Sequence, residues 1–574
     1  MKQPTDQLTQ IRFDSETYFR ISHVDDMRPF FMSIISDSDH WLFIGSNGGL
    51  TAGRKNSDHA LFPYYTDDKI IESAEITGSK TIVRIKGEGD TRLWEPFSVR
   101  YSNLYYLERN LYKNSYGNKV VFEEINHDLK LTFRYQWSTS SQFGFVRTSW
   151  LINEGGSVAH IEVVDGIQNI LPYGVGSALQ TKTSNLVDAY KRNELETKSG
   201  LGIVALSAII VDKAEPSEAL KASIAWSLGL PKAVRLLSST QLDNFRKGIP
   251  LVEEVDVKAE KGAYFVHAEI QLSPGDVQDW ILVSDVNQTA SQIISLTKAI
   301  AEDANLGAKV KQDVLHGTQK LIQLGAAADG LQFTADSLRD TRHFANTMFN
   351  IMRGGIFDDN YQIEKNDFVA YLGKANKGVA ERYAKVVDAL SEKMQRTELL
   401  NASATIDDQD FKRLCVEYLP LKFSRRHGDP SRPWNQFLIN TRTEDGSKVL
   451  DYAGNWRDIF QNWEALAHSY PAFIDGMILK FLNATTFDGY NPYRITKNGI
   501  DWERIEADDP WSYIGYWGDH QIIYLLKFLE FSEMYQPGRL ASYFNQNLFV
   551  YAHVPYKIKT YEEILKNPKD TIHF

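Results

Sequence analysis

Cysteine is almost missing from this sequence, because Cys415 is the only one among 574 residues. A disulfide scaffold and a cysteine-based zinc site are therefore excluded. Long apolar runs are missing too, and none reaches the roughly 18 residues that indicate a membrane-spanning helix. The opening residues MKQPTDQLTQ are polar and lack the apolar core of a secretory signal. We therefore expect a cytoplasmic protein with no membrane partner.

An excess of positive charge is also absent. Lysine and arginine number 63 against 74 aspartates and glutamates, which gives a formal net charge of −11. Such a chain gains little from releasing the counterions of a phosphate backbone, so we expect no nucleic-acid partner. The sequence lacks the phosphate loop of nucleotide kinases, the Gly-x-Ser-x-Gly turn of serine hydrolases and the His-Glu-x-x-His of zinc peptidases. We expect no metal and no organic cofactor.

The first half of the chain has the alternating pattern of β-strands. The stretch 129–137 has an apolar residue at every odd position, which predicts one buried and one wet face. Similar stretches occur at 81–86, 145–152 and 263–272, and turn-forming residues separate them. So many strands indicate a large antiparallel sandwich.

From Asn287 the apolar spacing becomes helical. Ile293, Leu296 and Ile300 lie three and four residues apart, and a second such run follows a break at 305–307. Further helices are expected at 340–353, 377–396, 407–418, 457–469, 471–484, 519–535 and 538–551.

The fold class is therefore expected to be α+β and multidomain. We expect an N-terminal antiparallel β-supersandwich at residues 1–286 and a helical linker at 287–335. Residues 336–574 are expected to form a helical domain with polar and aromatic loops at one end.

Polar and aromatic residues gather in three segments, 425–435, 454–464 and 508–520, each at or just before a predicted helix start. Six of the twelve tryptophans lie between Trp434 and Trp517. A sugar needs this mixture, because its hydroxyls pair with carboxylate, amide and guanidinium groups while its C–H faces pack on aromatic rings. The co-occurrence of the three segments favours a carbohydrate site.

Single residues in these segments also have structural alternatives. Asp519 precedes an apolar helical run, so it is placed to cap that helix. Asp458 lies in the first turn of its helix, where the macrodipole favours an anion. A tryptophan such as Trp456 lies more often in a hydrophobic core than beneath a sugar ring. Capping and ligand contact are compatible, so both interpretations stay open.

The order of parts resembles that of inverting glycoside phosphorylases of the cellobiose and chitobiose phosphorylase type. Asn455-Trp-Arg-Asp-Ile-Phe-Gln-Asn462 and Trp517-Gly-Asp-His520 are similar to two stretches of that family. Phe31-Met-Ser-Ile-Ile-Ser36 and Ser46-Asn-Gly-Gly49 resemble its opening strand and Gly-Gly turn. The resemblance implies a β-supersandwich, a two-helix linker and an (α/α)6 toroid.

The resemblance also implies site residues. In that family the arginine at the position of Arg457 holds the sugar whose bond is broken, together with an aspartate that is Asn462 here. The family's general acid lies in a later loop rich in Trp and Asp, and no such loop follows residue 520. We therefore expect that the catalytic acid is not in this chain and that the toroid is incomplete. Its remaining helices would lie on another segment or chain, and a homodimer is a separate expectation.

The implied activity is cleavage of β-glucosidic bonds in oligosaccharides with inversion, most simply by phosphorolysis with inorganic phosphate as co-substrate. One alternative is an inverting hydrolase on the same fold, and another is a non-catalytic glycan-binding or partner subunit of a split enzyme. The residues expected to bind the sugar are Asp429, Trp434, Trp456, Arg457, Asp458, Gln461, Trp517, Asp519 and His520. Those expected to draw phosphate are Arg425, Arg426 and Arg432.

Overall fold

The computed structural model describes residues 8–87, 91–101, 103–210, 218–426, 428–432, 437–443, 446–502, 521–568 and 570–573. The chain divides into two compact units. The first comprises residues 1–321 with 428–437, and the second comprises 322–427 with 438–574.

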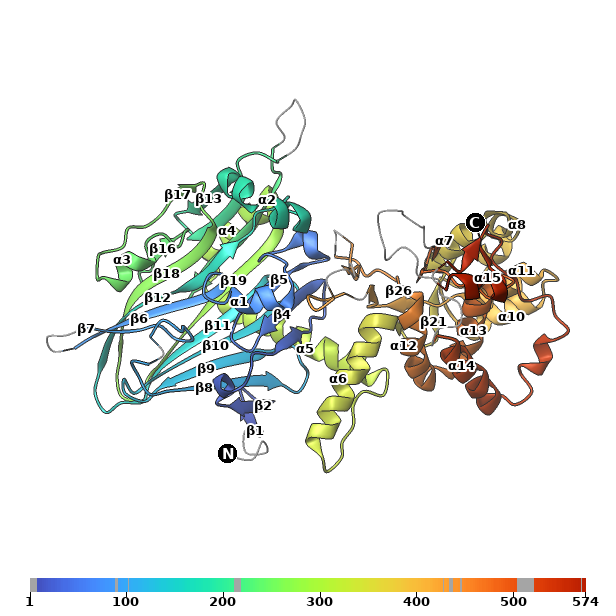
Figure 1. Cartoon of the computed structure of the whole chain (residues 1–574), viewed down its shortest axis with the longest axis horizontal. Coiled ribbons are helices and arrows are strands. Elements are labelled where there is room, and N and C mark those ends of the chain that lie inside the picture. The colour runs from blue at the N-terminus through green and yellow to red at the C-terminus, as the bar shows by residue number, and fades with distance from the viewer. Residues whose placement is uncertain are drawn as a thin grey trace. The chain divides into compact units, whose positions relative to one another are not determined.

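A large antiparallel sheet forms the body of the first unit (Figure 1). The predicted strands at 129–137 and 145–152 are neighbours in it, with Tyr135 opposite Ser149. In sheet order the strands are β1 (Leu8–Phe13), β2 (Glu16–Ser22), β8 (Leu107–Asn114), β9 (Val120–Asn126), β10 (Leu131–Ser140), β11 (Gly144–Asn153), β19 (Val277–Thr289), β15 (Lys221–Leu228), β14 (Leu201–Leu206), β13 (Lys191–Glu196) and β17 (Asp256–Lys258).

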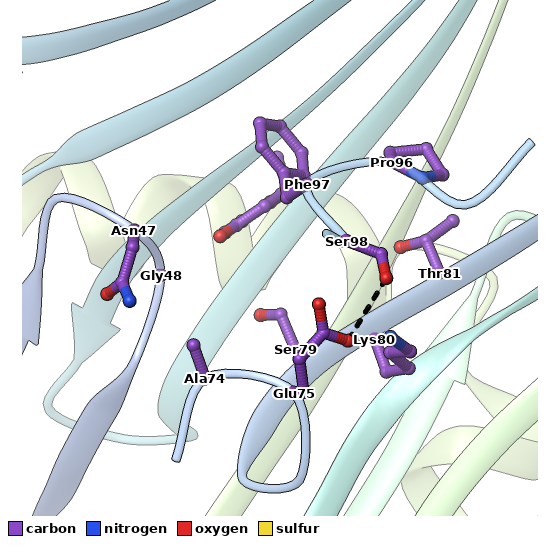
Figure 2. Close-up of a pocket in the computed structure, with 11 residues that line it drawn as sticks. Asn47, Gly48, Ala74, Glu75, Ser79, Lys80, Thr81, Pro96, Phe97 and Ser98 are labelled. Carbon is purple, nitrogen blue, oxygen red and sulfur yellow. Dashed lines mark hydrogen bonds and ion pairs between the residues drawn. The ribbon is translucent and has the colours of Figure 1, made fainter. Parts of the chain in front are cut away.

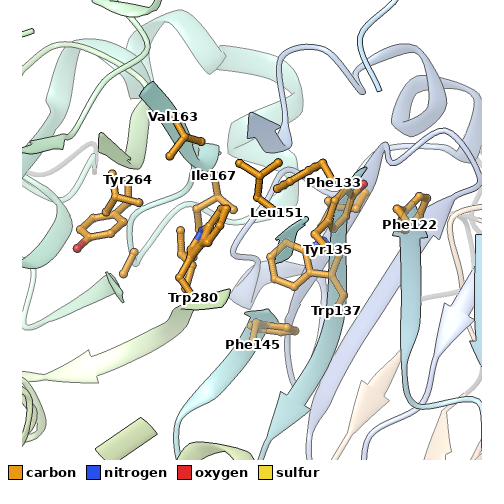
Figure 3. Packing of buried hydrophobic residues seen from close by; sticks show 14 of the residues in the cluster. Phe122, Phe133, Tyr135, Trp137, Phe145, Leu151, Val163, Ile167, Tyr264 and Trp280 are labelled. Atoms are coloured by element: carbon orange, nitrogen blue, oxygen red, sulfur yellow. The ribbon is translucent and has the colours of Figure 1, made fainter. Parts of the chain in front are cut away.

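A second antiparallel sheet packs on one face of the first. Phe133 and Trp280 from the large sheet share one buried cluster with Val163 and Tyr264 from the second (Figure 3). The strands of the second sheet, in order, are β16 (Val234–Leu236), β18 (Gly262–Leu272), β12 (Ala159–Ile170), β6 (Gly78–Lys86) and β7 (Thr91–Trp94). A smaller sheet contains β3 (Phe31–Ile34), β4 (His40–Gly45) and β5 (Leu50–Arg54), and short helices are α1 (Asp67–Glu72), α2 (Ser177–Tyr190) and α3 (Leu242–Arg246). The predicted antiparallel sandwich is present.

The two linker helices cover the other face of the large sheet. They are α4 (Ala290–Glu302) and α5 (Leu306–Ala326), and the predicted break at 305–307 lies where one ends and the next begins. Val310 packs with Trp226 and Ile281, whereas Trp280 and Leu282 point into the sandwich core. This alternation along β19 explains how one strand serves two apolar layers.

A charged pair lies deep within the sandwich. Arg147 donates from Nη1 to the Asp165 carboxylate at 2.6 Å, and both side chains are completely buried. The same carboxylate accepts from Trp280 Nε1 at 2.6 Å and from the Thr81 hydroxyl at 2.6 Å. The pair is therefore compensated by hydrogen bonds, which buried charges require.

Four longer helices form the main core of the second unit. α6 (Ser337–Gly354) packs on α12 (Trp456–Ser469), which packs on α14 (Gln521–Tyr535), and α13 (Ile474–Asn483) packs on α14. Phe460 on α12 contacts Trp463, Phe481 and Phe528. Smaller elements of this unit are α15 (Tyr561–Lys566), β24 (Arg425–Arg426), β25 (Leu438–Ile439), β26 (Ala453–Asn455), β27 (Arg494–Thr496), β28 (Gly499–Asp501), β29 (Lys557–Ile558) and β30 (Ile572–His573).

The segment between α6 and β24 has a core of its own. Phe368, Leu399, Phe411 and Cys415 lie in one buried cluster. The segment contains β21 (Gln362–Glu364), α7 (Lys365–Ala375), α8 (Lys377–Arg382), α9 (Ala384–Asp388), β22 (Lys393–Gln395), α10 (Arg396–Ala404) and α11 (Gln409–Glu417). It begins at β20 (Ile356–Phe357) and ends at β23 (Leu421–Lys422), and these two strands pair with each other. The chain therefore enters and leaves this α7–α11 cluster at neighbouring points.

Two helix predictions were wrong. The stretch 377–396 is not one helix, because Tyr383 leaves helical geometry (φ −107°, ψ 14°) between α8 and α9, and β22 follows. The stretch 538–551 contains only a 3-10 turn at Ala541–Tyr543, after Gly538 with φ of 79°. A positive φ stops helical hydrogen bonding, which apolar spacing alone does not reveal.

Within the described part of the chain, none of the helices is both long and apolar enough to span a bilayer.

Candidate functional site

The first residues of the segment 425–435 meet the segment 454–464 where α12 begins. β26 runs directly into α12, and β24, which carries Arg425, contacts both β26 and the neighbouring helix α6. Arg425 and the first turn of α12 are therefore positioned by the same short strands, although they are about 30 residues apart in sequence.

The Arg425 side chain is a cation without a carboxylate partner among the described residues. Its guanidinium lies 5.6 Å from the Phe423 ring centre, and its Nη2 lies 2.7 Å from the Met352 sulfur. Burial lowers the pKa of Arg425 to about 10, because the charged form loses contact with water. A desolvated guanidinium in apolar surroundings would gain from binding an anion.

Buried polar atoms without partners surround the start of α12. Asn455 stands at the cap position, yet its side chain makes no capping hydrogen bond. Asn455 Oδ1, Trp456 Nε1 and the Tyr452 hydroxyl are buried, and no hydrogen-bond partner is recorded for them among the described residues. Burial raises the pKa of Tyr452, so its hydroxyl stays a neutral donor. Such groups are rare in folded proteins and suit a ligand or water.

The Trp456 ring is a core group in this structure. It is 0% exposed and packs on Phe460 and Phe481, with ring centres 4.7 and 5.0 Å away. This placement differs from the sugar-stacking platform expected from sequence, because neither face of the ring is open. Of the two interpretations given above, the structure favours packing.

The next residues of α12 face outward. Arg457 and Gln461 are exposed, while Asp458 is half-buried. Arg457 and Gln461 lie one helical turn apart, so they share a face that a ligand could reach. Asp458 is an acid in the first turn, where the helix dipole favours its charge.

The remaining predicted residues are placed differently or lie outside the described ranges. Asp429 belongs to the first unit, where its carboxylate accepts from the Ser431 backbone N–H at 2.9 Å, and Arg432 in the same segment is exposed. Trp434, Trp517, Asp519 and His520 lie outside the described residues, as does the side chain of Arg426.

The sandwich contains a hollow that is too small for a sugar. It is lined by Glu75, Lys80, Ser98 and Tyr135 among others, and Glu75 accepts from the Ser98 hydroxyl at 3.2 Å (Figure 2). Its volume is about 20 Å³, which is room for one water molecule.

Sequence reasoning missed a much larger cavity in the second unit. It measures about 580 Å³ and lies along α6 and α12, with the end of α5 as a third wall. Asn462 and Glu464 in its wall belong to the segment 454–464, but Asn346 and Asn350 on α6 lie outside the three aromatic segments. Their four-residue spacing on α6 was the available signal, but such spacing also describes a solvated helix face.

Among protein families, residues 357–420 match the model described as glycoside hydrolase family 149 insertion domain 1. The match coincides with the α7–α11 cluster, whose ends pair through β20 and β23. It supports a carbohydrate-active protein of the glycoside hydrolase or phosphorylase kind. Helices predicted at 377–396 and 407–418 as part of a toroid thus fall in a segment similar to an insertion domain. Among curated protein sequences, nothing matches this chain.

Similar solved structures include three carbohydrate-related proteins. A bacterial glucoamylase complexed with acarbose is 11% identical, with a TM-score of 0.30, covering 83% of this chain and 70% of its own. A proposed kojibiose phosphorylase from the human microbiome is 10% identical, with a TM-score of 0.24, covering 90% of this chain and 53% of its own. A proposed aldose 1-epimerase from Escherichia coli K12 is 9% identical, with a TM-score of 0.26, covering 46% of this chain and 100% of its own. At TM-scores this low, the likeness to these structures says nothing about the activity of this chain.

Proposed function

We propose that this chain is part of a cytoplasmic enzyme that cleaves β-glucosidic bonds in oligosaccharides with inversion, using inorganic phosphate. The family match at 357–420 supports carbohydrate chemistry. The observation that favours phosphorolysis over hydrolysis is Arg425, a half-buried guanidinium that packs on Phe423 and the Met352 sulfur and has no carboxylate partner among the described residues. Water needs no cation to bind it, whereas phosphate does.

In this proposal, phosphate attacks the anomeric carbon from the face opposite the leaving oxygen. A phosphate oxygen forms the new C–O bond while the glycosidic C–O bond breaks, and a carboxylic acid gives its proton to the leaving oxygen. Phosphate is already ionised, so no general base is required. Arg425 holds the phosphate, and no residue of the described chain is assigned as the acid.

The sugar is proposed to lie over the first turn of α12. Arg457, Asp458 and Gln461 offer guanidinium, carboxylate and amide groups from the open side of that helix. Trp517, Asp519 and His520 stay sequence-based candidates for the same sugar, and Arg426 for its surroundings. Asp429, Arg432 and Trp434 belong to the first unit and stay predictions from the sequence alone.

The proposed toroid needs further helices as partners. α14 buries Leu525 and Phe528 but exposes Ile522, Ile523 and Leu526, each more than half exposed. An apolar face of this kind suits another helix, from a further segment or a second copy of the chain.

Phosphate dependence tests the proposal. β-Linked gluco-oligosaccharides are incubated with the protein, with and without phosphate, and sugar 1-phosphate and free sugar are measured. Sugar 1-phosphate formed only with phosphate is the expected result. Free sugar formed at an equal rate without phosphate would make the protein a hydrolase, and binding without turnover would make it a binding subunit.

A pair of arginine variants tests the sugar contact. Arg457→Ala should weaken oligosaccharide binding about tenfold, because a charge-assisted hydrogen bond contributes roughly 1.5–3 kcal/mol. Arg339→Ala, an exposed arginine on α6, is the control and should bind normally. Equal affinities of the two variants, measured by calorimetry, would remove Arg457 from the site.

A further inference from the structure

A strained turn leads into the strand that carries Arg425. Phe423 has a φ of 63°, in the left-handed region that a bulky side chain rarely adopts. It lies between β23, which pairs with β20, and β24, which pairs with β25. The chain therefore changes its pairing partner within two residues, and the backbone of Phe423 makes the turn.

Close packing against the end of α6 holds this turn in place. A Cβ on Gly355 would lie 3.0 Å from Leu421 Cβ and 3.3 Å from Ser424 Cβ, so any side chain there would press on the turn. The Ser424 hydroxyl donates to the Arg353 backbone carbonyl at 3.3 Å, and Phe423 is only 7% exposed. A strained backbone persists only where its surroundings fix it, and such strain gathers at functional sites.

The ring of Phe423 and the sulfur of Met352 lie beside the same guanidinium. The guanidinium carbon of Arg425 is 5.6 Å from the Phe423 ring centre, and its Nη2 is 2.7 Å from the sulfur. An aromatic face attracts a cation, and a thioether sulfur is a weak acceptor. Met352 belongs to the last turn of α6, so both contacts come from backbone that the packing fixes.

Part of the Arg425 guanidinium stays available to a ligand. The side chain is half-buried, and no hydrogen bond is recorded for its Nε or Nη1 among the described residues. A free arginine side chain samples many rotamers, and freezing them on binding costs affinity. Contacts that hold the guanidinium in one orientation beforehand reduce this cost and leave N–H groups for the oxygens of phosphate.

We propose that Phe423 and Met352 are positioning residues that hold the Arg425 guanidinium in the orientation in which it binds phosphate. Neither side chain offers phosphate a strong hydrogen bond, so each acts through Arg425. The inference rests on the proposed function, in which Arg425 holds the attacking phosphate. A merely structural role of the two residues would change the stability of the fold and leave the affinity for phosphate as it was.

The kinetics of phosphorolysis test the two residues. Phe423→Leu keeps apolar bulk but removes the ring, so the KM for phosphate should rise about threefold to tenfold. The kcat at saturating phosphate and the KM for the oligosaccharide should stay within about twofold, because bound phosphate itself orients the guanidinium. Met352→Leu conserves volume and removes only the sulfur contact, so the KM for phosphate should rise roughly threefold.

A matched control separates positioning from packing. Phe411→Leu removes a buried ring of the same size from the α7–α11 cluster, away from Arg425. It should lower the melting temperature without changing the KM for phosphate. An unchanged KM for phosphate in Phe423→Leu would overturn the positioning role. Where Phe423→Leu does not fold, an unchanged KM in Met352→Leu would do the same.

Failure of the proposed function has a different signature. Calorimetric titration of inorganic phosphate into the wild-type protein and into Arg425→Met measures binding without turnover. Tighter binding by the wild-type protein supports Arg425 as the phosphate ligand, and Phe423→Leu and Met352→Leu should then bind more weakly in the same titration. Equal binding by the wild-type protein and Arg425→Met would end the phosphate role of Arg425 and this inference with it. Normal phosphate binding that Phe423→Leu leaves unchanged would end only the positioning role.

Discussion

Two arginines, one in each unit, have opposite surroundings: Arg147 is fully buried and Arg425 is half-buried. Arg147 in the sandwich lies between strands and bonds Asp165 at 2.6 Å, and that carboxylate also accepts from Trp280 and Thr81. Arg425 in the helical unit faces Phe423 and the Met352 sulfur, with no carboxylate partner among the described residues.

The difference separates a charge with a complete structural partner from one that we propose to be functional. A buried ion pair whose carboxylate accepts several hydrogen bonds has little left to offer a ligand, and removing one member leaves the other uncompensated. An unpaired guanidinium costs stability in the free protein, and that cost is recovered when an anion binds. The presence or absence of a carboxylate partner therefore distinguishes a structural arginine from one that could bind an anion.

The largest expected effect comes from breaking the paired arginine. Asp165→Asn leaves the Arg147 charge buried without its carboxylate, and should lower the free energy of unfolding by about 3–5 kcal/mol. Denaturant titration of the sandwich measures this loss. Glu72→Gln, in the exposed Lys69–Glu72 pair, is the control and should leave the midpoint unchanged. An unchanged free energy of unfolding in Asp165→Asn would mean that other groups compensate the charge of Arg147.

The unpaired arginine should behave in the opposite way. Arg425→Met keeps the length and apolar contacts of the side chain but removes the positive charge. Because Arg425 has no carboxylate partner among the described residues, the substitution leaves no carboxylate unpaired. The free energy of unfolding should therefore stay within about 1 kcal/mol or rise, while phosphorolysis falls about 100-fold or more. Arg432→Met, at an exposed site, is the control for both measurements. A large loss of stability with normal turnover would place Arg425 among structural residues.

A smaller effect is expected at Trp456. Trp456→Phe reduces packing against Phe460 and Phe481, so the free energy of unfolding should fall by about 1–3 kcal/mol, although removal of an unpaired buried N–H offsets part of this loss. Oligosaccharide affinity should not change, because the ring has no open face. Titration calorimetry alongside denaturation checks both. A lost affinity at unchanged stability would restore the sugar platform expected from sequence.

The smallest effect concerns Cys415, which is buried in the α7–α11 cluster. Burial raises the pKa of its thiol to about 12, so at pH 8 the folded protein should react with a disulfide reagent far more slowly than the unfolded chain. Between pH 9 and about 12 only the folded state keeps this proton, so the contribution of Cys415 to stability falls as pH rises. Rapid labelling of native protein would show that the cluster opens readily.

The sequence predicted regular packing well and local interruptions poorly. Alternation along 129–137 located a sandwich strand, since one buried face imposes a period of two. The helix expected at 377–396 was interrupted at Tyr383, and its neighbours packed into a separate core, because apolar spacing does not say which partner a helix face meets.

The candidate site was predictable in composition but not in detail. Segments 425–435 and 454–464 suggested a shared site, and the structure does bring β24 and β26 into contact. Whether Arg425 had a carboxylate nearby depended on residues distant in sequence, as did the burial of Trp456. The cavity along α6 and α12 needed both helices in place before its amide groups faced one space.

The pairing of β20 with β23 gives the α7–α11 cluster the connections of an inserted module, although α11 also packs on α13. Because its two ends leave the helical core side by side, recombination could lengthen, exchange or delete the module while α6 and α12 keep their mutual packing. Related proteins of very different lengths could in this way share one helical frame.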